Sequence, residues 1–268
     1  KVVKILSAAD ILNAKRQGKI AIIYGFQNAA MVETDARKVD VFADRGVRII
    51  QLTYNGLNQL GGGALVPGDV GLTPFGHEVV DRLNARRVIV DLSHSGRAIC
   101  LDAARYSKQP ACITHTGCRT VADSPRNKTD EELRLVAERG GYVGIYFMPF
   151  IAPGRAFSSE DVANHIDHAI QVCGEDHVGI GTDHGVTSLG DMAAVRKHYA
   201  DMVNDRRRQG ISAPGEDPDL LPFGTDLIGP GQFRTMIATL RKRGYATARI
   251  EKIMGLNFQR YAQTVWGG

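Results

Sequence analysis

Three polar side chains, His94, His115 and Asp183, stand at the ends of short runs rich in Ile and Val. Two imidazoles and a carboxylate form a zinc-type ligand set that leaves room for an activated water. The chemistry expected from such a set is metal-assisted hydrolysis. A single histidine at a strand end often only bonds a loop, so the prediction depends on all three side chains meeting at one place.

The elements that would carry these side chains are apolar runs, which we interpret as strands buried on both faces. They begin between 24 and 40 residues apart, which is the spacing of βα units. In parallel folds the carboxyl ends of such strands face one shared edge or mouth, where active sites are assembled. The predicted strands are Ile20–Phe26, Val47–Leu52, Arg87–Leu92, Ala111–Thr114, Tyr142–Phe147 and His177–Gly181.

Helical patterns separate these runs and dominate the end of the chain. Thr129 and Glu132 form a capping box that opens one of the helices. From about Gly185 the pattern is mostly helical, with an insert rich in Pro and Gly at Ala213–Gly231. The predicted helices are Thr73–Arg86, Arg97–Ser107, a helix ending near Gly140, Glu160–Val172, Met192–Arg208, Gln232–Arg243 and Thr247–Met254.

Composition excludes several classes of protein. The chain has 268 residues, with 43% hydrophobic and 23% charged residues, which is typical of a globular protein. A net charge of +4, with no long run of Lys or Arg, argues against nucleic acid binding. No apolar stretch is long enough to span a membrane. The cysteines form no CxxC pair, and we expect reduced core thiols; they are Cys100, Cys112, Cys118 and Cys173.

Helix-separated parallel strands predict either an open doubly wound sheet or a closed (β/α)8 barrel. No GxGxxG or GxxxxGK[ST] motif follows the first predicted strand, which argues against a nucleotide-binding sheet. Six ordered motifs decide between the two, because together they resemble the membrane (renal) dipeptidase family, peptidase family M19, of the amidohydrolase-like barrels. The motifs are Gly46–Asn55, Gly71–Gly76, Val90–His94, Ser124–Asn127, Gly179–Asp183 and Gly255–Arg260.

The resemblance implies a role for each candidate residue. His94 and His115 match the family's two histidine ligands of one zinc ion, and Asp183 matches its catalytic acid/base. Arg126 matches the residue that holds the free carboxylate of the substrate, for which a guanidinium is well suited because it forms two parallel hydrogen bonds. Tyr54 stands where some relatives have a substrate-contacting histidine, and its hydroxyl could donate to a developing oxyanion.

The chain departs from the family pattern in two places. The family's opening strand carries a His-x-Asp pair of metal ligands, which has no counterpart here, and Ile20–Phe26 matches the family's third strand. We therefore expect one or two βα units to be missing, supplied by a preceding segment or by another chain. Gln27 stands where the family has a metal-bridging Glu. Two zinc ions ~3.7 Å apart repel by roughly 18 kcal/mol at an effective dielectric constant of 20, and a neutral amide does not offset this, so we expect one zinc ion rather than two.

Other polar residues are weaker candidates. Asn55 and His184 follow strand ends and could line a substrate pocket. Asp91 points to the opposite strand face from His94, so a structural hydrogen bond is expected. His165 and His168 are three residues apart on one helix and are interpreted as a solvated face. The glycines at 61–63 are interpreted as a flexible loop beside the mouth.

The prediction is a single domain over residues 1–268, with βα units at 1–186 and a helical extension with a closing helix at 187–268. Its function would be zinc-dependent hydrolysis of small peptides with a free carboxylate, most simply dipeptides. The alternatives are a barrel that only binds a small ligand, and a metal-dependent amidohydrolase acting on a lactone or a non-peptide amide. A homodimer is possible, and the cellular compartment stays open.

Overall fold

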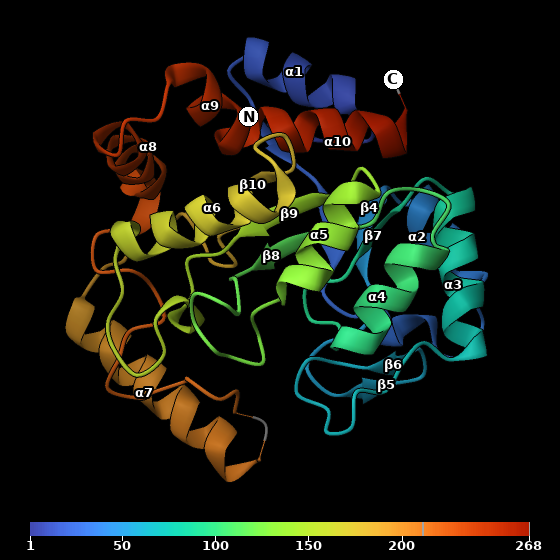
Figure 1. Ribbon diagram of the computed structural model, residues 1–268, viewed down its shortest axis with the longest axis horizontal. Helices are drawn as coiled ribbons and strands as arrows, with labels where there is room; N and C mark the ends of the chain where they lie inside the picture. Colours follow the sequence, from blue (N-terminus) through green and yellow to red (C-terminus); the bar gives the residue numbers. More distant parts are fainter. Residues whose placement is uncertain (211, 268) are drawn as a thin grey trace. The chain divides into compact units, whose positions relative to one another are not determined.

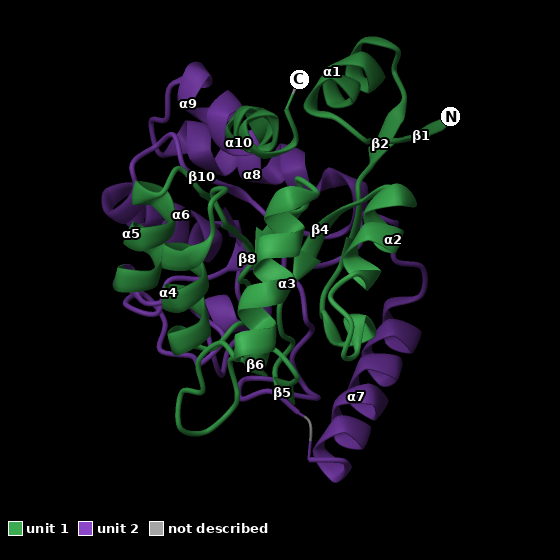
Figure 2. Cartoon of the chain, turned by 90° about the vertical axis from the view of Figure 1, so that its right-hand side faces the viewer, with its two compact units in different colours: residues 1–114, 131–143, 255–268 green, residues 115–130, 144–254 purple. Residues whose placement is uncertain are grey.

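The computed structural model describes residues 1–210 and 212–267, which alternate between short strands and helices. Contacts divide the chain into two compact units (Figure 2). Unit 1 comprises residues 1–114, 131–143 and 255–268, and unit 2 comprises residues 115–130 and 144–254. The chain passes between the units four times, twice within strands, at 114/115 and 143/144, and twice within helical elements, at 130/131 and 254/255.

Unit 1 is built on parallel strands. β1 (Val2–Lys4) pairs with β2 (Ile20–Ile22). The other strands follow the order β3-β4-β7-β8, and in this order adjacent strands pair in parallel. Their bounds are Tyr24–Phe26 for β3, Val47–Gln51 for β4, Ile89–Asp91 for β7 and Cys112–Thr116 for β8. A small antiparallel hairpin, β5 (Leu57–Asn58) with β6 (Gly61–Gly62), follows β4.

Helices follow most strands of unit 1, and the core lies between helices and strands. α1 packs against α10 (Figure 1). One buried cluster joins Ile5 and Ala8 near the amino terminus to Ile89 of β7 and to Tyr261 and Trp266 of α10. The helices are α1 (Ala8–Arg16), η1 (Ala30–Val32), α2 (Lys38–Asp44), α3 (Pro74–Ala85), α4 (Arg97–Tyr106), α5 (Asp130–Glu138) and α10 (Asn257–Trp266).

Unit 2 continues the same pattern with β9 (Tyr142–Ile145) and β10 (Val178–Ile180). The Tyr146 N–H donates to Thr116 O (3.0 Å), and the Gly181 N–H donates to Ile145 O (3.0 Å), so the ends of β8, β9 and β10 lie in that order. The helices are η2 (Pro149–Ile151), α6 (Ser159–Cys173), α7 (Met192–Arg208), η3 (Gly229–Gly231), α8 (Gln232–Lys242), α9 (Thr247–Glu251) and the π-helix η4 (Lys252–Leu256).

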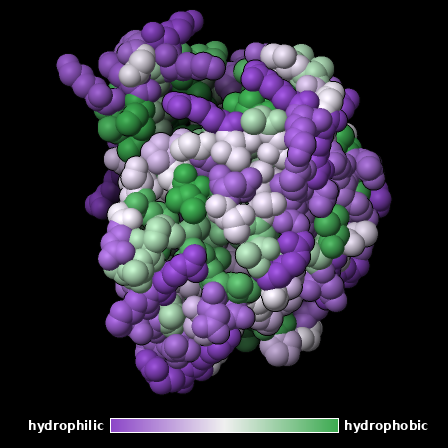
Figure 3. Space-filling view, turned by 90° about the vertical axis from the view of Figure 1, so that its left-hand side faces the viewer, coloured by the Kyte–Doolittle hydropathy of each residue, from purple (hydrophilic) through white to green (hydrophobic). Residues whose placement is uncertain are grey.

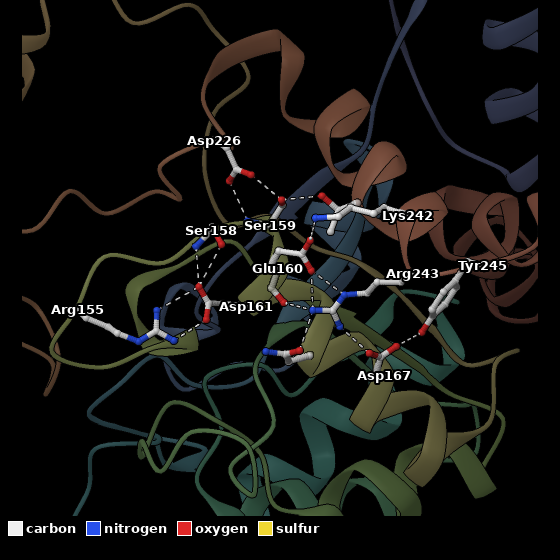
Figure 4. Close-up of polar contacts among 12 residues, drawn as sticks. Arg155, Ser158, Ser159, Glu160, Asp161, Asp167, Asp226, Lys242, Arg243 and Tyr245 are labelled. Atoms are coloured by element: carbon white, nitrogen blue, oxygen red, sulfur yellow. Dashed lines mark hydrogen bonds and ion pairs between the residues drawn. The ribbon is translucent and has the colours of Figure 1, made fainter.

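A polar network fastens α6 to α8 in unit 2 (Figure 4). The Arg243 guanidinium donates to Glu160 (2.9 Å) and to Asp167 (2.7 Å), both on α6. At the start of α6, Ser159 donates its N–H (2.8 Å) and its hydroxyl (2.6 Å) to the Asp226 carboxylate. The segment between α7 and α8 is thereby tied to the first turn of α6.

The structure confirms the α/β alternation, and every predicted strand and helix except the strand at Ile20–Phe26 is present with slightly different ends. The four cysteines are free and buried, as expected. Among the described residues, no helix combines the length and the apolar character needed to cross a bilayer.

Three predictions about the first 63 residues are wrong. Ile20–Phe26 is two strands, because β2 pairs with β1 and β3 pairs with β4. All three residues of β2 are exposed, so this strand is not buried on both faces. The glycines at 61–63 are buried in the β5–β6 hairpin and its flank rather than in a flexible loop.

Candidate metal centre

His94 lies three residues beyond Asp91, the last residue of β7, and is 3% exposed. Asp91 shapes the strand end because its carboxylate accepts from the N–H groups of Ser93 (3.0 Å) and Thr114 (3.0 Å). The expectation of a structural hydrogen bond at Asp91 is confirmed. The carboxylate therefore fixes the turn on which His94 stands.

Two side chains orient the His94 ring. Nδ1 of His94 lies 2.7 Å from Asn55 Oδ1, and the Tyr54 ring stacks on the imidazole with centroids 4.2 Å apart. Since an amide oxygen only accepts, Nδ1 carries the proton and the lone pair is on Nε2. That tautomer is the one in which Nε2 can bind a metal, and an acceptor behind the ring increases its basicity.

The main chain of the β5–β6 hairpin and of the residues after it holds Asn55 and His94. The Ala64 N–H donates to His94 O (2.7 Å), and the Leu65 N–H donates to Asn55 O (3.0 Å). A Cβ atom at Gly63 would lie 1.8 Å from Tyr54 O, a distance that no side chain can occupy. Gly63 therefore allows the close backbone approach that places Tyr54 and Asn55.

In unit 2, β8 presents His115 and the segment after β10 presents Asp183. His115 Nε2 lies 3.8 Å from Asp183 Oδ1, and the two side chains are only 7% and 14% exposed. Asp183 has φ of 62°, in the left-handed region that residues other than Gly and Asn seldom adopt. Such backbone conformations concentrate at functional sites, where the surroundings hold them in place.

Arg126 is buried, at 1% exposed, and its guanidinium carbon lies 5.9 Å from the centroid of the Phe150 ring. The neighbouring Asn127 is held by its amide, which donates to Ala122 O (2.7 Å) and Phe150 O (2.9 Å). The Tyr146 hydroxyl donates to Asn127 Oδ1. Burial raises the pKa of Tyr146, so its hydroxyl keeps the donated proton at neutral pH. The loop that carries Arg126 is thus fixed by a buried network.

His165 is fully buried, and the interpretation of His165 and His168 as a solvated face is wrong for this residue. The Cys118 N–H donates to His165 Nδ1 (2.8 Å), and His165 Nε2 lies 3.0 Å from Ile151 O. Burial lowers the pKa of His165 to about 4, so the ring is neutral at physiological pH. It joins α6 to the segment after β8 and to η2. His168 pairs with Asp130 at 2.8 Å.

The structure places the remaining candidates at strand ends. Gln27 directly follows β3 with an exposed side chain, and its main-chain oxygen accepts from Gln51 Nε2 (2.6 Å). His184 lies between the rings of Phe147 and Phe223, with centroids 6.1 and 6.4 Å away. Its Nδ1 lies 3.1 Å from Gly185 O, while its Nε2 is buried without a hydrogen-bond partner in the part of the chain that the structure describes.

Sequence reasoning missed the residues that support the candidate ligands. It treated Asn55 only as a possible pocket residue, although Asn55 bonds the His94 ring. It did not predict the contact of Tyr146 with Asn127. Local sequence signals, such as helix caps and turns, give no indication of these contacts, because each partner comes from a distant part of the chain.

Comparisons with known proteins show the family of this chain. A family model described as membrane dipeptidase (peptidase family M19) matches residues 1–214. The chain is 29% identical over 272 residues to an uncharacterized protein in the pqqA 5' region of Klebsiella pneumoniae, covering 97% of this chain and 88% of that protein. It is 33% identical over 189 residues to an uncharacterized dipeptidase of Schizosaccharomyces pombe, covering 67% of this chain and 45% of that protein.

Among solved structures, an amidohydrolase from Pseudomonas aeruginosa is 34% identical, with a TM-score of 0.85, covering 100% of this chain and 79% of that one. The fold is therefore an α/β fold of the metallo-dependent hydrolase barrel kind, as predicted. The chain belongs to the membrane dipeptidase family, peptidase family M19. That family places it among the hydrolases that act on peptide bonds. The chain spans about half the length of several of the curated dipeptidases that it matches.

Proposed function

We propose that this protein hydrolyses dipeptides with the help of one bound zinc ion. One observation carries the proposal: in a chain of the M19 family, His115 Nε2 and the Asp183 carboxylate lie 3.8 Å apart, both largely buried. An imidazole nitrogen beside a carboxylate oxygen fits the donor set of zinc. The roles proposed below for the other residues rest on the family and on this donor pair.

The proposed metal ligands are His94 and His115, and Asp183 is the third candidate donor. Strand register supports this grouping. Asp91 of β7 pairs with Cys112 of β8, and each histidine lies three residues beyond its member of the pair. His94 thus follows the carboxyl end of β7, and His115 lies near the carboxyl end of the adjacent parallel strand β8. The Asn55 contact leaves Nε2 of His94 as the donor atom. A bound ion would polarise the scissile carbonyl and lower the pKa of a water molecule.

Asp183 is the proposed acid/base. Its carboxylate is close enough to His115 to accept the proton of a water molecule positioned there, and to return that proton to the leaving amine. The left-handed backbone at Asp183 is of the kind that concentrates at functional sites. Gln27, in the position of a bridging carboxylate, supplies no negative charge, and this supports a single ion.

Four residues are proposed to bind the substrate. Arg126 would hold its free carboxylate with a buried guanidinium, which limits the length of the peptide. Tyr54 and Asn55 lie at the His94 ring and would line the same pocket. In His184, Nδ1 donates to Gly185 O, so Nε2 is an acceptor and would receive an N–H of the substrate.

The test measures the hydrolysis of a set of dipeptides by the zinc-loaded protein, with the release of free amine as the readout. We expect turnover of dipeptides but not of peptides with a blocked carboxyl group. Asp183→Asn should lower kcat by roughly 10²–10⁴-fold while zinc remains bound. Arg126→Lys should raise KM more than it lowers kcat. Zinc-replete protein that cleaves no dipeptide would contradict the proposal.

A further inference from the structure

A cavity of about 200 Å³ lies in unit 2, beside the first two turns of α7. Its apolar lining consists mainly of half-buried side chains: Met192, Leu220, Leu221, Phe223 and Ile228. Arg196 and Asp219, of opposite charge, also border it. Figure 3 views the molecule from the side on which α7 and α8 lie, and shows apolar side chains gathered within a largely hydrophilic surface.

One lining residue of the cavity, Phe223, lies beside the neighbour of the proposed catalytic residue. His184 is the residue after Asp183, and the centroid of its ring lies 6.4 Å from that of Phe223, which lines the cavity. The other flank of His184 is Phe147, one of the largest fully buried side chains. Phe223 therefore borders both the cavity and the ring of the residue that follows Asp183.

The lining is held in place by polar contacts outside it. The Thr225 N–H donates to Phe157 O (2.8 Å), and the neighbouring Asp226 carboxylate accepts from the Ser159 N–H (2.8 Å) and hydroxyl (2.6 Å) at the start of α6 (Figure 4). A Cβ atom at Gly224 would lie 3.1 Å from Phe157 and from Leu227. The segment that carries Phe223 is thus packed in place without a ligand, as expected for a pre-formed site.

We propose that this cavity binds an apolar side chain of the substrate and makes the enzyme prefer dipeptides with one large apolar residue. The inference rests on the proposed dipeptidase function and adds the class of substrate. At about 200 Å³ the cavity is smaller than the roughly 300–1,000 Å³ of pockets that enclose whole ligands. Arg196 and Asp219 together add no net charge, so no charged side chain is favoured.

The test compares kcat/KM for Phe-Gly, Gly-Phe and Gly-Gly in the zinc-loaded protein. We expect kcat/KM for one of the two phenylalanine dipeptides to exceed that for Gly-Gly by at least roughly 10-fold. Burial of a large apolar side chain in a pocket favours the transition state by about that factor or more. Leu221→Trp fills the cavity and should remove this preference, so that kcat/KM for the phenylalanine dipeptides falls to about that for Gly-Gly. Met202→Trp, at an exposed α7 position outside the lining, is the matched control.

Ile228→Phe is a smaller filling change for the same test, and circular dichroism checks that each variant folds. An equal effect of Leu221→Trp on all three dipeptides, or none on any, would overturn the inference while leaving dipeptide hydrolysis intact. If the wild type cleaves no dipeptide, the proposed function fails. Calorimetric titration of Asp183→Asn with the three dipeptides, with and without Leu221→Trp, then tests the cavity separately. Tighter binding of a phenylalanine dipeptide than of Gly-Gly, abolished by Leu221→Trp, would support the inference about the cavity. Equal binding of all three dipeptides would reject it.

Discussion

The surroundings of His94 and those of His115 differ in what holds them. The backbone around His94 is held by main-chain contacts: the Ala64 N–H donates to the His94 carbonyl oxygen, and the glycine at 63 allows the Tyr54–Asn55 backbone to approach. The segment after His115 depends in addition on buried side chains, because the Cys118 N–H donates to the His165 ring and the Tyr146 hydroxyl donates to Asn127.

This difference indicates how each region tolerates change. A main-chain support fails when a side chain intrudes, whereas a side-chain support fails when a partner is removed or changes its charge. The first region should therefore be sensitive to added volume. The second should be sensitive to pH through His165.

The largest expected effect is that of Gly63→Ala. The new Cβ would lie 1.8 Å from Tyr54 O and 2.5 Å from Asn55 C, so the backbone must move. We expect the free energy of unfolding in urea to fall by about 3 kcal/mol or more. Gly56→Ala, in the same hairpin, has nothing within 4 Å of the new Cβ and is the control. Equal stability of the two variants would contradict the inference that close backbone approach at Gly63 supports the region of His94.

The next effect concerns pH. The pKa of His165 falls from 6.5 to about 4 on folding, so its contribution to stability is complete above pH 6.5 and is lost as pH falls toward 4. The loss should reach roughly 3 kcal/mol, measured by urea unfolding between pH 7.5 and 4. His165→Gln should flatten this slope, and His198→Gln, at an exposed α7 position, should not. A slope unchanged by His165→Gln would show that other groups cause the acid sensitivity.

Asn55→Ala tests the orientation of the His94 ring. It removes the acceptor 2.7 Å from Nδ1, and loss of such a partner typically lowers metal affinity 10- to 100-fold. Competition with a chelator measures the zinc affinity. Asn55→Asp keeps an acceptor and should retain most of the affinity. If Asn55→Ala binds zinc like the wild type, His94 does not ligate the ion through Nε2.

The smallest effect is expected for Asp226→Ala. The carboxylate accepts from Ser159 at the start of α6, and loss of a capping acceptor costs about 1 kcal/mol. Thermal or urea unfolding measures the change, and Asp226→Asn, which keeps an acceptor oxygen, should lose less. A loss above about 3 kcal/mol would mean that this contact supports far more of unit 2 than α6.

Much of the fold could be predicted from local sequence. The apolar runs at β4 and β9 and the capping signals of α5 and α6 are properties of neighbouring residues, so they predict elements without knowledge of the partners. β1 and α1 were missed, because β1 has only three residues and α1 fully buries only two alanines. The capping box of Ser7 and Asp10 was the available signal.

The sequence by itself determined the parallel α/β architecture, the free buried cysteines and the chain positions of His94, His115 and Asp183, because these follow from apolar periodicity and from what ends each strand. Only the tertiary structure decided that His165 is buried and neutral, that Asn55 sets the tautomer of His94, and that Gly63 must remain a glycine. The reason is that burial and close backbone approach depend on segments far apart in the chain, whose distances no local pattern contains.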